Sequence, residues 1–146
     1  MRAYSVLYTA HCTSTGGRDG HAKCDDNPSH LDVKLVKPKE LGGSGGNDGT
    51  NPEELFAAGY SGCFLGAMGL AAKNLKKTLP KSTTVSAAVS IGKHTNGNLG
   101  LKVDLTAKLP GASQADADAI VKVAHQICPY SHATRNNIDV NLKATT

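Results

Sequence analysis

Residues 55–72 read LFAAGYSGCFLGAMGLAA, a run that contains no charged side chain. Its larger residues recur at steps of three to five, as on a helix, and small or apolar residues fill the positions between them, so most faces should be buried. Just before the run, Thr50 or Asn51 can cap a helix, and Pro52 suits the first helical position. The sequence therefore predicts a long, largely buried helix that begins at Pro52 and ends near Lys77.

A second helix is predicted to begin at Ser113 and to end before Pro129. Asp116 lies three residues after Ser113, an arrangement like a capping box with Asp in place of Glu. The apolar residues that follow share one helical stripe: Ala117, Ile120, Ala124, Ile127 and Cys128. Because Pro129 cannot continue the helix, Cys128 should lie on its buried face in the last turn.

Alternation of apolar and polar residues predicts strands around these helices. The alternating residues fall in five segments: 4–8, 31–35, 85–91, 99–109 and 138–142. Residues 92–100 contain Asn96-Gly97, which is typical of a hairpin turn. We expect an α+β fold with antiparallel sheets packed around two main helices. A chain of 146 residues suits one domain, here residues 1–146.

Composition argues against two classes of partner. The formal net charge of +4 is spread without a dense basic block, and the chain has 2 Phe, 4 Tyr and no Trp. Nucleic-acid binding is therefore not expected, since it needs a basic surface with aromatic stacking platforms. Residues 1–10 hold no continuous apolar segment, so neither a signal peptide nor membrane attachment is expected. We expect a cytoplasmic, reducing location.

The four cysteines show no tight repeated spacing and do not suggest a secreted disulfide framework. Cys63 lies in the first helix and Cys128 ends the second. This pair fits peroxide chemistry, in which one thiol is oxidised and another traps the product as a disulfide. Cys63 taken alone would be better explained as a small buried hydrophobe, and only its combination with Arg18 and Cys128 favours chemistry. Cys12 and Cys24 are given no catalytic role, and no metal site is expected.

A buried thiol inside a helix has a raised pKa and is inert unless a cation approaches it. Arg18 is the foremost candidate, because its loop, GGRDG at 16–20, can bring a guanidinium inward. Other cations remain as alternatives: Arg2, Arg135 and the lysines. A buried guanidinium needs a carboxylate, which Glu53 or Glu54 could supply. Taken singly, Arg18 could be a solvated turn residue and Glu53 an ordinary acid of the first helical turn.

Short segments carry a family likeness: TGGRDG (15–20), LGG (41–43), TNPE (50–53), LFAAGYS (55–61), CF (63–64), HQ (125–126), CPYS (128–131), ATR (133–135) and NIDV (137–140). Together, in order and over nearly the whole chain, they resemble the organic hydroperoxide resistance proteins, a branch of the OsmC/Ohr superfamily. The chain departs from that pattern at Glu54, where Gln is frequent, and at His132, where Asn is usual. Cys12 and Cys24 are additional to it.

The resemblance implies a thiol peroxidase of organic hydroperoxides. In it Cys63 would be peroxidatic, Cys128 resolving, and Arg18 with Glu53 the pair that tunes Cys63. The resemblance also implies an intertwined homodimer that is reduced by a dihydrolipoyl-type dithiol, either dihydrolipoamide or a lipoylated protein. No bound cofactor is expected, because sulfur carries both electrons.

Phe56 and Tyr60 would line an apolar pocket that accepts fatty acid, alkyl or aryl hydroperoxides better than hydrogen peroxide. Two alternatives stay open. The chain could belong to the broader OsmC-type branch with another substrate range, or it could be a non-catalytic dimer that binds apolar ligands or senses oxidant through a reversible disulfide.

Helix geometry constrains how Arg18 and Glu53 could act. In a continuous helix Glu53 and Cys63 are ten residues apart, or about 15 Å along the axis. One arginine cannot easily touch both. Either the helix is kinked near its start, or Arg18 and Glu53 reach Cys63 from the other subunit. We expect the second arrangement, because the apolar helix needs more cover than one small domain provides.

Overall fold

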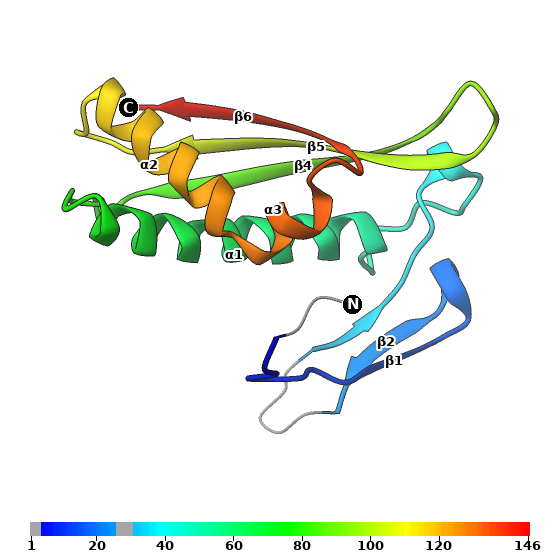
Figure 1. The fold of residues 1–146 in the computed structure, drawn as a ribbon. Helices are drawn as coiled ribbons and strands as arrows, with labels where there is room; N and C mark the ends of the chain where they lie inside the picture. Colours follow the sequence, from blue (N-terminus) through cyan, green and yellow to red (C-terminus); the bar gives the residue numbers. More distant parts are fainter. Residues whose placement is uncertain (1–3, 26–30) are drawn as a thin grey trace. The chain divides into compact units, whose positions relative to one another are not determined.

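The computed structural model describes residues 4–25 and 31–146 (Figure 1). The chain divides into two compact units, Met1–Pro52 and Glu53–Thr146. Among the described residues, each unit has one three-stranded sheet. The three α-helices of this part of the chain lie in the second unit, apart from Pro52, where the first of them begins. The predicted α+β class is confirmed.

The sheet of the second unit has the strand order β4-β5-β6. The hairpin of β4 (Thr84–Lys93) and β5 (Leu99–Lys108) confirms the predicted turn, in which Gly97 has a φ of 85°. Strand β6 (Asp139–Thr145) pairs with β5 in parallel, so the expectation of purely antiparallel sheets was wrong. The helices between β5 and β6 return the chain to the end where β5 began, which a parallel pair requires.

Two helices were predicted in place, and a third was missed. Helix α1 (Pro52–Asn74) ends before Lys77, because Lys76 adopts a φ of 54° and the Lys77 N–H bonds the Ala72 carbonyl at 2.9 Å. Helix α2 (Gln114–Ile127) has the predicted cap, since Ser113 Oγ accepts from the Asp116 N–H at 3.1 Å. Pro129 ends α2 and is also the first residue of α3 (Pro129–Thr134). Proline suits a first helical position, because its missing N–H is not needed there and its fixed φ is helical.

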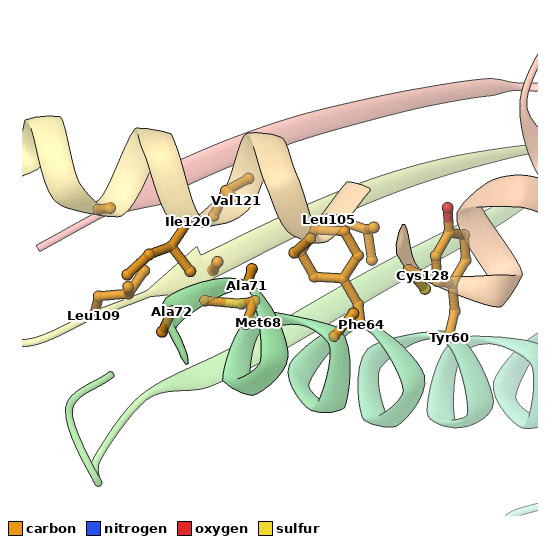
Figure 2. Packing of buried hydrophobic residues seen from close by; sticks show 14 of the residues in the cluster. Tyr60, Phe64, Met68, Ala71, Ala72, Leu105, Leu109, Ile120, Val121 and Cys128 are labelled. Atoms are coloured by element: carbon orange, nitrogen blue, oxygen red, sulfur yellow. The ribbon is translucent and has the colours of Figure 1, made fainter. Parts of the chain in front are cut away.

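One hydrophobic core joins α1 and α2 to one face of the second sheet (Figure 2). The strands contribute alternate residues in register, for example Val103 beside Val89 and Val140. The largest fully buried side chains of the two helices and β5 are Tyr60, Phe64, Met68, Leu105 and Ile120. Burying a side chain such as Leu105 stabilises the fold by roughly 1.5–3 kcal/mol.

Helix α1 is long and apolar enough to cross a membrane, with a mean hydropathy of 1.5 over its most apolar window. Length and composition are weak evidence, however, because the core helix of a soluble protein passes the same test. Tyr60, Phe64, Met68 and Ala71 of α1 are fully buried in the core that includes α2 and β5. Helix α1 therefore acts here as the central helix of a packed core.

The sheet of the first unit has the order β1 (Cys12–Thr15), β2 (His21–Cys24) and β3 (Asp32–Lys34). The strand predicted over residues 4–8 was wrong, since residues 4–11 form no strand. Tyr4 and Tyr8 are 82% and 77% exposed. Alternation produces a strand only where another strand pairs with it, and the part of the chain that the structure describes offers none here.

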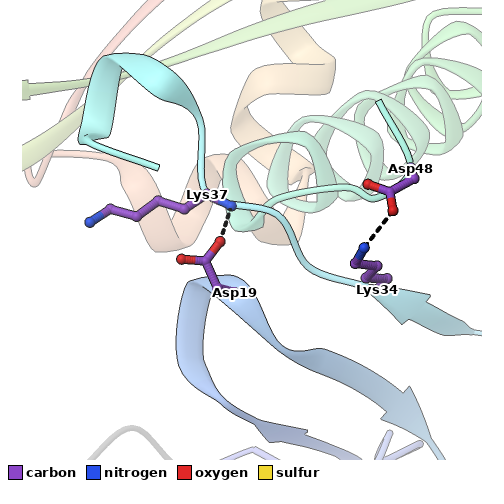
Figure 3. Close-up of polar contacts among 4 residues, drawn as sticks. All are labelled: Asp19, Lys34, Lys37 and Asp48. Atoms are coloured by element: carbon purple, nitrogen blue, oxygen red, sulfur yellow. Dashed lines mark hydrogen bonds and ion pairs between the residues drawn. The ribbon is translucent and has the colours of Figure 1, made fainter. Parts of the chain in front are cut away.

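The loop that carries Arg18 is attached to the following segment of the first unit through the Asp19 side chain. Arg18 lies in the 3-10 helix η1 (Gly17–Asp19) between β1 and β2, after Gly16 with a φ of 70°. Asp19 Oδ1 accepts from the Lys37 N–H at 2.8 Å, while Lys34 pairs with Asp48 (Figure 3). A second 3-10 helix, η2 (Lys39–Leu41), follows this segment. The turn around Arg18 is therefore a defined structure.

A disulfide joins Cys12 to Cys24. The two residues lie directly opposite each other on the antiparallel strands β1 and β2. The sequence suggested no disulfide framework and left open whether this pair oxidises. Short strands with exposed residues give no clear alternation, so the sequence did not reveal the pairing that brings these cysteines together.

The disulfide predicts a distinct thiol count. Protein that has not met a reductant, unfolded in denaturant, should titrate two thiols per chain, because only Cys63 and Cys128 are free. Pretreatment with dithiothreitol should raise the count to four, whereas a Cys12→Ser/Cys24→Ser variant should give two in both conditions. Four thiols in the untreated protein would contradict the disulfide.

Candidate active site

The two free cysteines lie side by side in the second unit. Cys128 Sγ donates to Cys63 Sγ at a distance of 3.6 Å. Cys128 is fully buried, whereas Cys63 is partly exposed. A disulfide bond is about 2.05 Å long, so the two sulfur atoms need to approach by only about 1.5 Å to bond. The arrangement suits a pair in which an incoming molecule meets Cys63 first.

Cys128 is fixed by the backbone on both sides. Its N–H bonds the Ala124 carbonyl at 2.8 Å and closes α2, while its carbonyl accepts from the His132 N–H at 2.9 Å and opens α3. Its own backbone is extended, with φ −65° and ψ 125°. A residue that precedes proline disfavours the helical conformation, so the Cys128-Pro129 sequence itself creates this junction.

The surroundings of Cys63 favour its protonated thiol over the thiolate. Burial raises the pKa of the Cys63 thiol above its ordinary value, and the neighbouring Cys128 thiol adds to that rise. A hydrogen bond from the Tyr130 backbone N–H acts the other way and lowers the pKa. The net direction is upward, so the Cys63 thiol is mostly protonated at neutral pH unless a positive charge lies near it.

Helix α3 is attached to α1 by buried hydroxyl groups. The Tyr60 hydroxyl lies 3.0 Å from Ser131 Oγ and 3.1 Å from Thr134 Oγ1. All three side chains are buried, with exposures of 0%, 0% and 5%. Tyr60 was predicted from the sequence as a pocket wall, whereas Ser131 and Thr134 were not singled out. The only sequence signal for those two was their place in the segments that carry the family likeness.

Aromatic side chains surround the junction of α1 and α3. The Phe56, Tyr60 and Tyr130 rings lie within 5.9 Å of one another by their centroids. Gly59 makes this packing possible, since a Cβ atom there would come within 2.9 Å of the Tyr130 hydroxyl. The helices can approach closely because one of them carries glycine at the contact.

Arg18 and Glu53 occupy different units of the chain. Arg18 is half-buried in η1 of the first unit, and Glu53 lies in the first turn of α1, at the start of the second. Helix α1 is continuous from Pro52 to Asn74, so Glu53 and Cys63 remain about 15 Å apart along its axis. A break near the helix start therefore does not bring Glu53 to Cys63.

No group of three His, Cys, Asp or Glu side chains suited to a metal ion occurs within residues 4–25 and 31–146. His21 and Cys24, two residues of types that can bind zinc, already have other partners. Cys24 is bonded to Cys12, and His21 contacts Asp32. The candidate site thus consists of the two thiols and the residues around them.

Known proteins share both the sequence and the fold. A family model described as OsmC-like protein matches residues 45–143. The organic hydroperoxide resistance protein of Xanthomonas axonopodis pv. citri is 53% identical over 137 residues, which cover 94% of each chain. The crystal structure of an organic hydroperoxide resistance protein from Elizabethkingia anophelis superposes with a TM-score of 0.88 at 46% identity, covering 98% of this chain and 99% of that one.

The crystal structure of the organic hydroperoxide resistance protein OhrB of Bacillus subtilis gives a TM-score of 0.84 at 37% identity, over 96% of this chain and 100% of that one. These similarities extend over both units of the chain and confirm the resemblance seen in its sequence segments. The chain belongs to the organic hydroperoxide resistance branch of the OsmC-like family.

Proposed function

We propose that the protein reduces organic hydroperoxides to alcohols through Cys63 and Cys128. The family ties the chain to organic hydroperoxide resistance and to oxidative stress. The observation that carries the finer proposal is the pair of free thiols whose sulfur atoms lie 3.6 Å apart, one partly exposed and one buried. This spacing suits a thiol that is oxidised and a neighbour that completes the reaction.

The first step is attack of the Cys63 thiolate on the distal oxygen of the hydroperoxide. An S–O bond forms, the O–O bond breaks, and the alkoxide takes a proton and leaves as the alcohol. Cys63 is thereby oxidised by two electrons to a sulfenic acid. The Cys128 thiolate then attacks the Cys63 sulfur, water leaves, and a Cys63–Cys128 disulfide remains. An external dithiol of the dihydrolipoyl type reduces this disulfide and restores both thiols, so no bound cofactor takes part.

Activation of Cys63 needs a positive charge, because burial raises the pKa of its thiol. We assign this role to Arg18, with Glu53 as the carboxylate that holds the guanidinium. Both residues act from the partner subunit of a homodimer. The uninterrupted α1 supports this arrangement, since it keeps Glu53 far along the axis from Cys63 of the same chain.

A row of glycines on one face of α1 supports the homodimer. Gly62, Gly66 and Gly69 lie inside the helix, and none has a described neighbour within 4 Å of its Cβ position. Glycine in a helix interior costs about 1 kcal/mol relative to alanine, and three such residues on one face allow another segment to pack closely against the helix. Leu70, 52% exposed, belongs to the same helix. A second copy of the chain would cover this face and the exposed apolar side chains of residues 4–8.

The aromatic cluster around Phe56 supports a preference for organic hydroperoxides over hydrogen peroxide. Phe56 is partly exposed beside Tyr130, and the Tyr60 ring lies buried beside both. Apolar walls stabilise the alkyl or aryl group of an organic hydroperoxide but add nothing for hydrogen peroxide.

The proposal places the reaction in the cytoplasm, with no nucleic acid or membrane as partner.

Substitution of either thiol tests the proposal in a steady-state assay with tert-butyl hydroperoxide and dihydrolipoamide. Cys63→Ser should abolish turnover, because serine does not form the nucleophilic thiolate. Cys128→Ser should still react once, after which mass spectrometry should find sulfenic or overoxidised Cys63 in place of the disulfide. Substantial turnover by Cys63→Ser would refute the assignment, and consumption of only one equivalent by the parent would identify an oxidant sensor.

Mixed dimers test Arg18 and the partner arrangement together. Arg18→Met should raise the pKa of Cys63, measured by thiolate absorbance against pH, and should slow the hydroperoxide reaction; Arg18→Lys should be intermediate because it keeps the charge. Refolded dimers of one Arg18→Met chain and one Cys63→Ser chain should regain one working site if Arg18 acts across the interface. Inactive mixed dimers would place Arg18 and Cys63 of one site in the same chain.

A further inference from the structure

Helix α3 is too short to hold its own position. It spans six residues, and an isolated helix of this length is not stable in water. Two groups at its start nevertheless contact Cys63: the Cys128 thiol at its N-cap and the Tyr130 backbone N–H. The contacts that fix α3 therefore also fix the surroundings of the Cys63 sulfur.

The buried hydroxyl groups of Tyr60, Ser131 and Thr134 form a directed chain of hydrogen bonds. Thr134 Oγ1 donates to the Tyr130 carbonyl at 3.0 Å, and each hydroxyl has one proton to donate. The Tyr60 hydroxyl therefore donates to Thr134 Oγ1 and can accept from Ser131 Oγ. Removing the Tyr60 hydroxyl would take one hydrogen bond from Ser131 Oγ and one from Thr134 Oγ1 in a buried site, and Thr134 would keep only its contacts to backbone carbonyls.

Tyr60 ties α3 to the part of α1 that carries Cys63. The two residues are three positions apart and lie one above the other on the helix. In Figure 2 the Tyr60 side chain rises from α1 with its hydroxyl toward α3, and Cys128 lies beside it. One turn of α1 thus supplies both the thiol and the side chain that holds its neighbour in place.

We propose that Tyr60 is a positioning residue that, through Ser131 and Thr134, holds the start of α3 against Cys63. The inference rests on the proposed roles of Cys63 and Cys128. Tyr60 touches neither sulfur through its hydroxyl, and it acts by keeping the Cys128 thiol and the Tyr130 N–H within reach. Its loss would slow disulfide closure and weaken the hydrogen bond that favours the Cys63 thiolate.

Tyr60→Phe tests this role, because it removes only the hydroxyl. Reduced protein is mixed with diamide, which accepts two electrons and two protons as Cys63 and Cys128 join, and peptide mapping follows the disulfide with time. We expect closure on the order of tenfold slower than in the parent, since a misplacement of about 1 Å can cost up to a hundredfold. The pKa of Cys63, from thiolate absorbance against pH, should rise.

Thr83→Val is the matched control. Thr83 is also buried, and its hydroxyl has no hydrogen-bond partner among the described residues. This variant loses a buried hydroxyl outside the chain of hydrogen bonds and should keep the parental closure rate and Cys63 pKa. Ser131→Ala should slow closure, and combining it with Tyr60→Phe should add little, because both break the same connection.

If Tyr60→Phe formed the Cys63–Cys128 disulfide at the parental rate and kept the parental pKa of Cys63, the proposal would be overturned. The buried hydroxyl groups would then only stabilise the fold. Thr134→Val gives a second test if Tyr60→Phe does not fold. The diamide reaction needs no hydroperoxide, so it separates this inference from the proposed function. Slow closure in Tyr60→Phe, together with a parent that fails to turn over hydroperoxide, would support the positioning role and refute the peroxidase.

Discussion

The need to cover α1 governs the arrangement of the second unit. The helix is apolar on nearly every face, and water would be a poor neighbour for any of them. The sheet and α2 enclose one side through Phe64, Met68 and Ala71. Helix α3 closes over the turn that contains Tyr60 and Cys63. The thiol pair therefore lies at the edge of a core, where burial and access meet.

Such a position creates opposing demands on Cys63. Burial protects the sulfur from unspecific reactions and brings Cys128 within 3.6 Å, but it also disfavours the charged form that reacts. The Tyr130 N–H offsets part of this cost, since a backbone donor favours a thiolate without adding a charge. The remainder calls for a cation near the sulfur, which the proposal above assigns to Arg18.

The sequence predicted the elements whose side chains alternate or recur around a packed core. The helices around Cys63 and after Ser113, and the strands β4, β5 and β6, all have long runs with one buried face. The strands β1 and β2 were missed because each has only four residues and little burial. Helix α3 was missed because a proline can mark the end of one helix or the start of another, and Pro129 marks both.

The candidate site was predictable to differing extents. Helix periodicity correctly predicted the burial of Cys128, whereas Cys63 is partly exposed. The proximity of the two thiols depends on how α1, α2 and α3 pack, which no local pattern encodes. Arg18 and Glu53 were assigned by family resemblance, supported by the charge that a buried thiol requires. The hydroxyl contacts of Tyr60 depend on α3, which no sequence pattern predicts, so the sequence indicates Tyr60 only as part of a pocket wall.

The Cys12–Cys24 disulfide adds to the number of electrons that the oxidised protein takes up in a reductive titration. It lies between an exposed residue of β1 and a half-buried residue of β2, and a solvent-accessible disulfide is open to attack by any added thiolate. A chain with both cysteine pairs oxidised would accept four electrons, only two of which belong to Cys63 and Cys128. Reductive titrations of the intact protein would therefore overstate the capacity of the Cys63–Cys128 pair twofold, unless the amino-terminal disulfide is measured separately.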